Sequence, residues 1–175
     1  AYDFVAYKSK DPEAINLEDV TILTKPTKSA EELLKYAENY MHASSLLRNL
    51  MNASAVEVTT LTLAQEAKKL EKYGMKVTII DKKQLEKLGC GLILGVGRGA
   101  EHPPLMAIIE YKHKSKDKEP SVAFVGKGIT FDTGGLNLKP SGYIETMKLD
   151  MAGAATVLSL FHMIGMSKIP GHFIG

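Results

Sequence analysis

The chain has no tryptophan and only one cysteine. That cysteine, Cys90, excludes a disulfide within the chain and fits a reducing compartment, so we expect a cytoplasmic protein. Cys90 follows Gly89 and precedes an apolar run, which predicts a small buried residue rather than a nucleophile. No uninterrupted apolar run approaches the roughly 18 residues that a membrane-spanning helix needs, so we expect no membrane partner.

Arginine is also scarce, occurring only at Arg48 and Arg98, so lysine provides nearly all the positive charge. The net charge is +2, and the lysines are interspersed with glutamates except in the stretch 112–118. This pattern indicates a solvated surface rather than a track of basic residues for a nucleic acid. With 45% apolar and 24% charged residues among 175, the composition is that of a soluble globular domain with a core of its own.

Segments with the sequence patterns of helices alternate along the chain with segments that have those of β-strands. Capping-box patterns at 29–32 and 62–65 predict two helix starts, and Asp81 with Gln84 predicts a third. The expected helices cover 29–52, 62–73, 82–88 and 151–164, and the expected strands cover 75–80, 104–111, 121–125 and 170–174. This alternation predicts an α/β fold with a mostly parallel sheet flanked by helices.

Charged residues and glycines gather directly after the predicted strand 121–125, in the stretch 125–140, which reads VGKGITFDTGGLNLKP. In an open parallel sheet, ligands bind beyond the carboxyl ends of the strands. Gly128 lets the chain turn, so Lys127 and Asp132 can converge there, and the glycine pair that follows can bring Lys139 back over the same place. Asp150 stands at the expected N-cap of the next helix. From spacing alone, ion pairs, a helix cap and a metal or anion site all remain open.

The stretch 125–140, followed by MKLDMAGAATVL at 147–158, resembles the leucyl aminopeptidase (cytosol aminopeptidase) family of di-zinc metallopeptidases. The similarity extends upstream through LLRNLMNASAVEVTTLTLAQ and GVGRGAEHPPLMAIIEY. It implies a hydrolase that removes N-terminal amino acids, leucine-type residues among them, from short peptides. It also implies a zinc-peptidase-like catalytic domain that assembles as a homohexamer.

The resemblance assigns a role to each residue of the motif. Lys127, Asp132 and Asp150 would bind two divalent metal ions, which are zinc ions with manganese or magnesium as alternatives at the exchangeable position. Lys139 would be a catalytic cation, and Met147 would line the pocket for the N-terminal side chain of the substrate. All five residues would contact the substrate region. A lysine binds metal only as the neutral amine, so the metal charge must overcome a reference pKa of about 10.4.

The family also has a motif NTDAEGR, which supplies an aspartate, a glutamate and an arginine and does not occur in this chain. We therefore expect a fragment. Residues 1–28, with breaks at Pro12 and Pro26, are expected to be a lead-in or linker from an N-terminal domain outside the chain. Residues 29–175 would be the N-terminal part of the catalytic domain, incomplete, and we expect apolar surface to be left exposed.

Two other functions are open. A nucleotide-binding module is suggested by the glycines of 95–99 and of 126–128, but neither stretch has the spacing that cradles phosphates. A non-catalytic, DNA-binding or architectural relative of the same family is the second, although the chain has no arginine-rich patch. The five histidines lack metal-type spacing, so we expect packing or surface positions for them.

The isolated chain is not expected to hold a working di-metal site, because Lys127, Asp132 and Asp150 leave two zinc ions under-coordinated. Zinc titration followed by calorimetry should therefore show no pair of tight sites per chain. Two tight sites would contradict the expectation.

Overall fold

The computed structural model describes residues 2–9 and 19–175. The elements in chain order are α1 (Lys28–Asn52), α2 (Thr60–Lys68), η1 (Lys69–Tyr73), β1 (Lys76–Ile80), α3 (Lys82–Lys87), α4 (Gly91–Val96), β2 (Met106–His113), β3 (Val122–Ala123), η2 (Ile144–Leu149), α5 (Ala152–Ser167) and β4 (Gly171–Ile174). The α/β class predicted from the sequence, a sheet with helices packed on it, is confirmed.

The sheet contains strands in the order β1-β2-β4-β3, and its strand directions are mixed. β1 pairs with β2 and β2 with β4 in antiparallel fashion, whereas β3 and β4 are parallel. Strand direction therefore differs from the mostly parallel arrangement that we expected. The reason is that β1 pairs with β2 from a distant part of the chain, and the alternation of elements alone does not specify the direction of paired strands.

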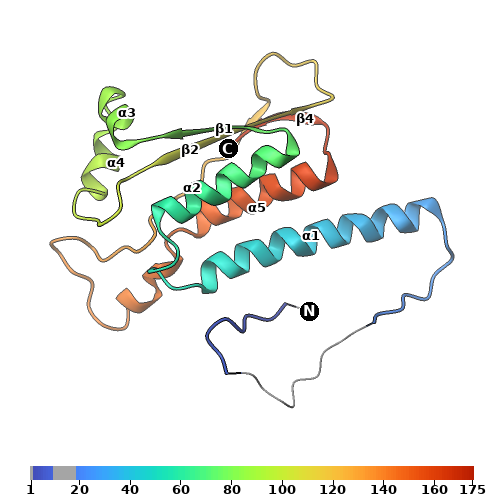
Figure 1. The fold of residues 1–175 in the computed structure, drawn as a ribbon, viewed down its shortest axis with the longest axis horizontal. Coiled ribbons are helices and arrows are strands. Elements are labelled where there is room, and N and C mark those ends of the chain that lie inside the picture. Colours follow the sequence, from blue (N-terminus) through green and yellow to red (C-terminus); the bar gives the residue numbers. More distant parts are fainter. Residues whose placement is uncertain (1, 10–18) are drawn as a thin grey trace.

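One face of the sheet is covered by α2 and α5, with α1 beyond them, while α3 and α4 lie together at one end (Figure 1). The core lies between this face and the helices, where Val77 and Ile109 of the sheet meet the side of α5 that carries Phe161. Phe161 is fully buried, and Phe124 packs against its ring at 6.1 Å. Helix α5 is thus the central element of the packing.

Two of the three helix starts differ from those that the capping-box patterns predict. Helix α1 is capped by Thr27, whose hydroxyl accepts the Ala30 N–H, and α2 is capped by Thr59, which accepts the Thr62 N–H. Both expected capping boxes, at 29–32 and 62–65, are therefore wrong by two or three residues. The third is confirmed, because Asp81 forms a reciprocal capping box with N3 of α3.

Two elements were not predicted. Helix α4 occupies the glycine-containing stretch 91–96, so the glycines of 95–99 do not form a loop after a strand. Cys90 precedes it and is half-buried, not buried as expected. The 3₁₀-helix η2 fills the gap before α5. Both elements are only six residues long, too short for helical periodicity to be distinguished from a loop.

The described part of the lead-in contains no helix or strand before Lys28, as expected, and Pro12 lies outside the described residues. Its first residues contact the end of α1. The Tyr2 hydroxyl donates to Asn49 at 2.9 Å and accepts from the Asn52 side chain at 3.1 Å. Tyr7 accepts the Ser54 N–H at 2.8 Å. The origin of this segment as a linker stays a prediction.

The stretch Ile144–Ser167, which joins η2 to α5, is long and apolar enough to cross a membrane, with a mean hydropathy of 1.4. The core helix of a soluble protein meets the same criterion, and α5 places Phe161, Leu158 and Ile164 in the core of this fold. We therefore interpret α5 as a core helix.

Among the side chains of α5, removal of the Phe161 ring should lower the free energy of unfolding the most. We expect Phe161→Ala to lower the free energy of unfolding by about 3–5 kcal/mol, because the cavity forms where sheet and helix meet. Leu23→Ala is the control, because Leu23 is 95% exposed. Urea unfolding measures both, and equal losses would contradict the placement of the core.

Candidate functional site

The chain that leaves β3 lies directly against the first turn of α5. A Cβ added to Gly126 would lie 2.5 Å from the carbonyl oxygen of Gly153, and one added to Gly153 would lie 2.8 Å from the Lys127 nitrogen. The Ala154 N–H donates to the Lys127 carbonyl oxygen at 2.8 Å. Only glycine fits at 126 and 153, and this contact fixes the backbone of Lys127 against α5.

The Lys127 ammonium faces Asp150, which stands just before α5. Its Nζ lies 3.0 Å from Asp150 Oδ2, and the two side chains are 58% and 20% exposed. Asp150 Oδ2 is itself buried and accepts no aligned hydrogen bond, so this contact is electrostatic. Asp150 was expected as the N-cap of α5, but Met151 occupies that position. Asp150 is instead the C-cap of η2 and donates its N–H to the Met147 carbonyl oxygen.

The loop between Asp132 and Lys139 closes on itself through its glycines. Gly134 has φ of +88°, and a Cβ there would lie 2.4 Å from the Asn137 carbonyl oxygen. The Gly134 N–H donates to Asp132 Oδ1 at 2.9 Å, and the Lys139 N–H donates to the Thr133 carbonyl at 2.9 Å. Asp132 and Lys139 therefore stand side by side at the base of the loop, as the glycine pair predicted.

Their side chains form a second ion pair, with Lys139 Nζ 3.0 Å from Asp132 Oδ2. The pKa of Asp132 is lowered, first by the hydrogen bond from the Gly134 N–H, then by the one from Lys139, and to a smaller extent by the charges of Lys139 and Lys127. The charge of Lys127 therefore acts on Asp132 as well as on its partner Asp150. We call Lys127, Asp132, Lys139 and Asp150 the charged cluster.

Met147 is the fifth residue expected here. It lies on η2, is half-buried, and its carbonyl oxygen accepts the Asp150 N–H at 3.1 Å. Its backbone therefore holds the residue that pairs with Lys127. The role of its side chain in a substrate pocket stays a prediction.

The donors of the charged cluster suit a divalent metal ion. Carboxylates are ligands that zinc accepts, and a neutral amine has a lone pair to donate. The buried Asp150 Oδ2 accepts no hydrogen bond and has only the charge of Lys127 beside it, so a metal ion would give it a direct partner. Across the described ranges 2–9 and 19–175, no three His, Cys, Asp or Glu side chains are grouped as a metal site would require. A metal ion here therefore depends on the lysine amine.

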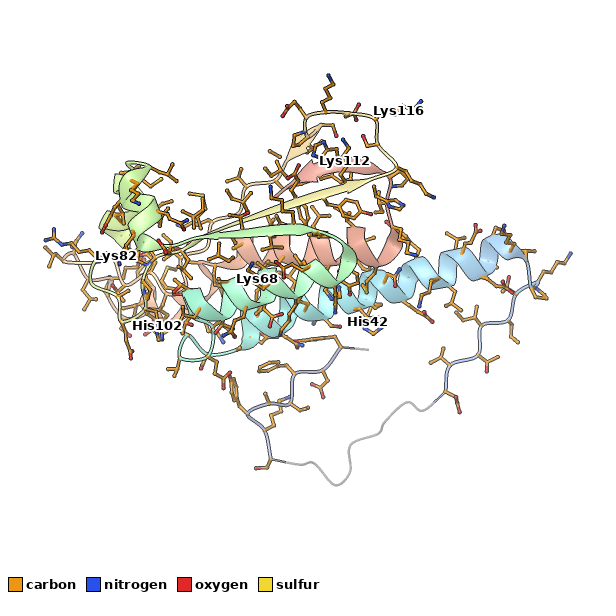
Figure 2. The ribbon with its side chains drawn as sticks, turned by 45° about the horizontal axis from the view of Figure 1, so that its top comes forward. His42, Lys68, Lys82, His102, Lys112 and Lys116 are labelled. Atoms are coloured by element: carbon orange, nitrogen blue, oxygen red, sulfur yellow. The ribbon has the colours of Figure 1, made fainter. Side chains whose placement is uncertain are left out.

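The histidines are distributed over several elements, among them His42 on α1, His162 on α5 and His172 on β4. His42 on α1 and His102 beyond α4 lie at separate places in Figure 2. His162 packs against Tyr73, and burial, with a smaller effect of the Lys72 charge, lowers its pKa. His172 is buried and pairs with Glu110 at 3.0 Å. These are packing and surface positions, as expected.

Large apolar side chains near the charged cluster are exposed, as expected. Val125 is 95% exposed and Leu136 is fully exposed. Leu138, Tyr143 and Leu149 are exposed as well. The cluster therefore stands at an apolar surface rather than in a closed pocket.

The sequence profile described as "Cytosol aminopeptidase family, catalytic domain" matches residues 45–175. The chain belongs to the cytosol aminopeptidase family. The match includes the whole charged cluster and Met147. The glycine-rich stretches therefore occur in a peptidase-type domain, and the comparisons give the DNA-binding alternative no support.

Curated members of the family match the full chain. The chain is similar to a "Probable cytosol aminopeptidase" of Agrobacterium fabrum, at 40% identity over 100% of this chain and 36% of that protein. It is also similar to a protein of the same name from Aquifex aeolicus, at 38% identity over 95% of this chain and 33% of that protein. The chain thus spans about a third of the length of these relatives.

Solved structures of the family share the fold. The crystal structure of cytosol aminopeptidase from Coxiella burnetii matches with a TM-score of 0.74 and 35% identity, over 81% of this chain and 30% of that one. The bottromycin maturation enzyme BotP in complex with Mn matches with a TM-score of 0.80 and 32% identity, over 99% of this chain and 35% of that one.

The charged side chains follow from the sequence, whereas the contact between Gly126 and Gly153 that positions Lys127 was not predicted. Gly126 and Gly153 lie in the stretches 125–140 and 147–158, on which the family resemblance rests. A signal was available, because one glycine follows a strand and the other opens the next helix. Their mutual contact depends on the tertiary structure.

The lowered pKa of Asp132 can be measured directly. We expect its carboxyl to titrate below the usual value of about 3.9, so that the ion pair is intact above pH 4 and is lost as the pH falls through the lowered pKa. Lys139→Met should raise this pKa but not restore it fully, because the Gly134 N–H remains. Carbon-13 NMR of the carboxyl groups measures the change.

Lys127→Met is the matched variant, because Lys127 acts on Asp132 only through its charge. It should raise the pKa less than Lys139→Met does. A larger effect of Lys127→Met, or none of Lys139→Met, would contradict the geometry of the charged cluster.

Proposed function

We propose that this chain supplies the metal-binding residues and the catalytic cation of a metal-dependent aminopeptidase, which removes N-terminal residues of leucine type from peptides. The observation that carries the proposal is the charged cluster, in which each of two carboxylates has a lysine at 3.0 Å and one of them has a buried oxygen that accepts no hydrogen bond. Membership of the cytosol aminopeptidase family supports it.

The residues for metal binding would be Lys127, Asp132 and Asp150. Two divalent ions, zinc with manganese or magnesium at an exchangeable position, would supply an activated water and polarise the peptide carbonyl. The manganese complex of BotP supports such ions in this fold. Asp132 would be one of the carboxylates that hold these ions, and the Gly134 N–H orients it through Oδ1.

The charges of the cluster are balanced when both lysines are protonated. Lys127 would bind metal only after losing its proton, which leaves the cluster with a net charge of −1 and favours a dication. The backbone contact between Gly126 and Gly153 keeps Lys127 close to Asp150 in either state. The backbone position of Lys127 therefore does not depend on the charge of its side chain.

Lys139 would remain protonated. When Asp132 is engaged by a cation, the ammonium of Lys139 is available to donate to the oxyanion that forms as the peptide carbonyl is attacked. The closed loop from Asp132 to Lys139 fixes the base of both side chains. Met147 would contribute an apolar wall for the substrate's first side chain.

The whole enzyme extends beyond these residues, because the chain spans about a third of its curated relatives. We propose that the remaining metal ligands come from the rest of the catalytic domain, so that the chain alone is inactive. The complete protein would be a cytoplasmic homohexamer acting on short peptides.

The test is a hybrid in which this chain replaces the matching third of the Agrobacterium fabrum relative. The hybrid should hydrolyse leucine p-nitroanilide and lose this activity on chelation. Lys139→Met should lower kcat about 10²–10³-fold while Mn²⁺ still binds, because it removes one oxyanion donor. Asp150→Asn should weaken Mn²⁺ binding itself. Electron paramagnetic resonance of Mn²⁺ separates the two effects.

Lys116→Met is the control, because Lys116 lies on the loop that follows β2 (Figure 2) and is in neither ion pair of the charged cluster. It should behave as the unmodified hybrid. A hybrid that folds but neither binds Mn²⁺ nor hydrolyses the amide would refute the proposal, as would full activity of Lys139→Met.

A further inference from the structure

Helix α1 ends at Asn52 without a basic side chain of its own to bind its last carbonyl oxygens. Its last turn contains no basic residue, and its C-cap N–H bonds back to the Asn49 carbonyl. The Asn52 carbonyl oxygen accepts no backbone hydrogen bond within the described residues. The C-terminal end of a helix favours a cation, both for the open carbonyls and for the helix dipole.

The cation comes from a distant part of the chain. Lys148 Nζ donates to the Asn52 carbonyl oxygen at 2.9 Å, across 96 residues of sequence. Lys148 is half-buried on η2, between Met147 and Asp150. Among the hydrogen bonds that the described residues make, this is the only one between α1 and η2.

The other end of η2 is held locally. Glu145 accepts from the Ser141 hydroxyl at 2.7 Å and from the Gly142 N–H at 2.8 Å. Those bonds close a turn that belongs to the same exposed loop, so they do not fix η2 relative to the rest of the fold. The hydrogen bond from Lys148 to α1 does link η2 to the rest of the fold, because α1 packs on α5 through Asn39 and the core residue Leu50.

We propose that Lys148 is a positioning residue of the site: by binding the C-terminal carbonyl of α1, it holds η2 so that Asp150 faces Lys127. It touches neither metal nor substrate in this role. The consequence for metal binding rests on the proposed function, whereas the placement of Asp150 does not.

A plain helix-capping role is the competing explanation, because lysines commonly bind the last carbonyls of a helix. It predicts a loss of stability shared by the whole fold. Positioning predicts a loss of order confined to η2 and Asp150, with Met151 still buried in the core. The two explanations therefore predict faster amide hydrogen exchange in different parts of the chain.

Amide hydrogen exchange of the metal-free chain tests the placement. In Lys148→Met, exchange of the Asp150 amide, which bonds to the Met147 carbonyl, should be about tenfold faster, while that of Phe161 in α5 should change little. Lys148→Arg keeps a donor and should restore slow exchange. Lys82→Met, on α3, is the matched control and should resemble the unmodified chain.

Mn²⁺ binding to the hybrid tests the consequence. Lys148→Met should bind Mn²⁺ about 10–100-fold more weakly, as is usual when a group that orients a ligand is removed, and Lys148→Arg should restore it. Unchanged exchange at Asp150, equal acceleration throughout α5, or failure of Lys148→Arg to restore exchange would each overturn the positioning role.

The two proposals fail separately. If the hybrid binds no Mn²⁺ but Lys148→Met still accelerates exchange at Asp150, the metallopeptidase proposal fails and the positioning role stands. If the hybrid binds Mn²⁺ and Lys148→Met binds it equally well, the positioning role fails and the proposed function is unaffected.

Discussion

The site depends on one close contact between two backbones. The chain leaving the sheet at Gly126 lies against Gly153 in the first turn of α5, and the Ala154 N–H binds the Lys127 carbonyl. No side chain fits between them. Because α5 is also the central helix of the core, the position of Lys127 is set by the same packing that stabilises the fold. The ion pair with Asp150 then orients the Lys127 side chain, whose backbone the packing has already positioned.

Around that contact, each carboxylate of the charged cluster has a lysine beside it. Asp132 is further held by the Gly134 N–H, which contributes most to its lowered pKa. Asp150 has no such donor, and its buried oxygen relies on charge alone. The two acids are therefore not equivalent: one is oriented by its own loop, and the other by elements that meet from distant parts of the chain.

Local sequence patterns predicted some features of the fold and missed others that depend on distant parts of the chain. The capping box at Asp81 was correct, and Asp81 and Gln84 make the reciprocal hydrogen bonds that the motif predicts. The boxes proposed near Ser29 and Thr62 were displaced, since Thr27 and Thr59 are equally good caps and sequence alone does not choose between neighbours. The mixed strand directions were missed because pairing between β1 and β2 joins segments about 30 residues apart, a choice that the alternation of elements leaves open.

The sequence by itself determined the chemistry: two aspartates and two lysines at fixed spacing, with glycines that permit the turn between them. It also determined the family, because that stretch is long and continuous. Only the tertiary structure decided which lysine faces which aspartate, that Gly126 and Gly153 touch, and that Lys148 reaches the end of α1. Spacing limits where a side chain can reach, whereas its partner is chosen by packing between segments that sequence order keeps apart.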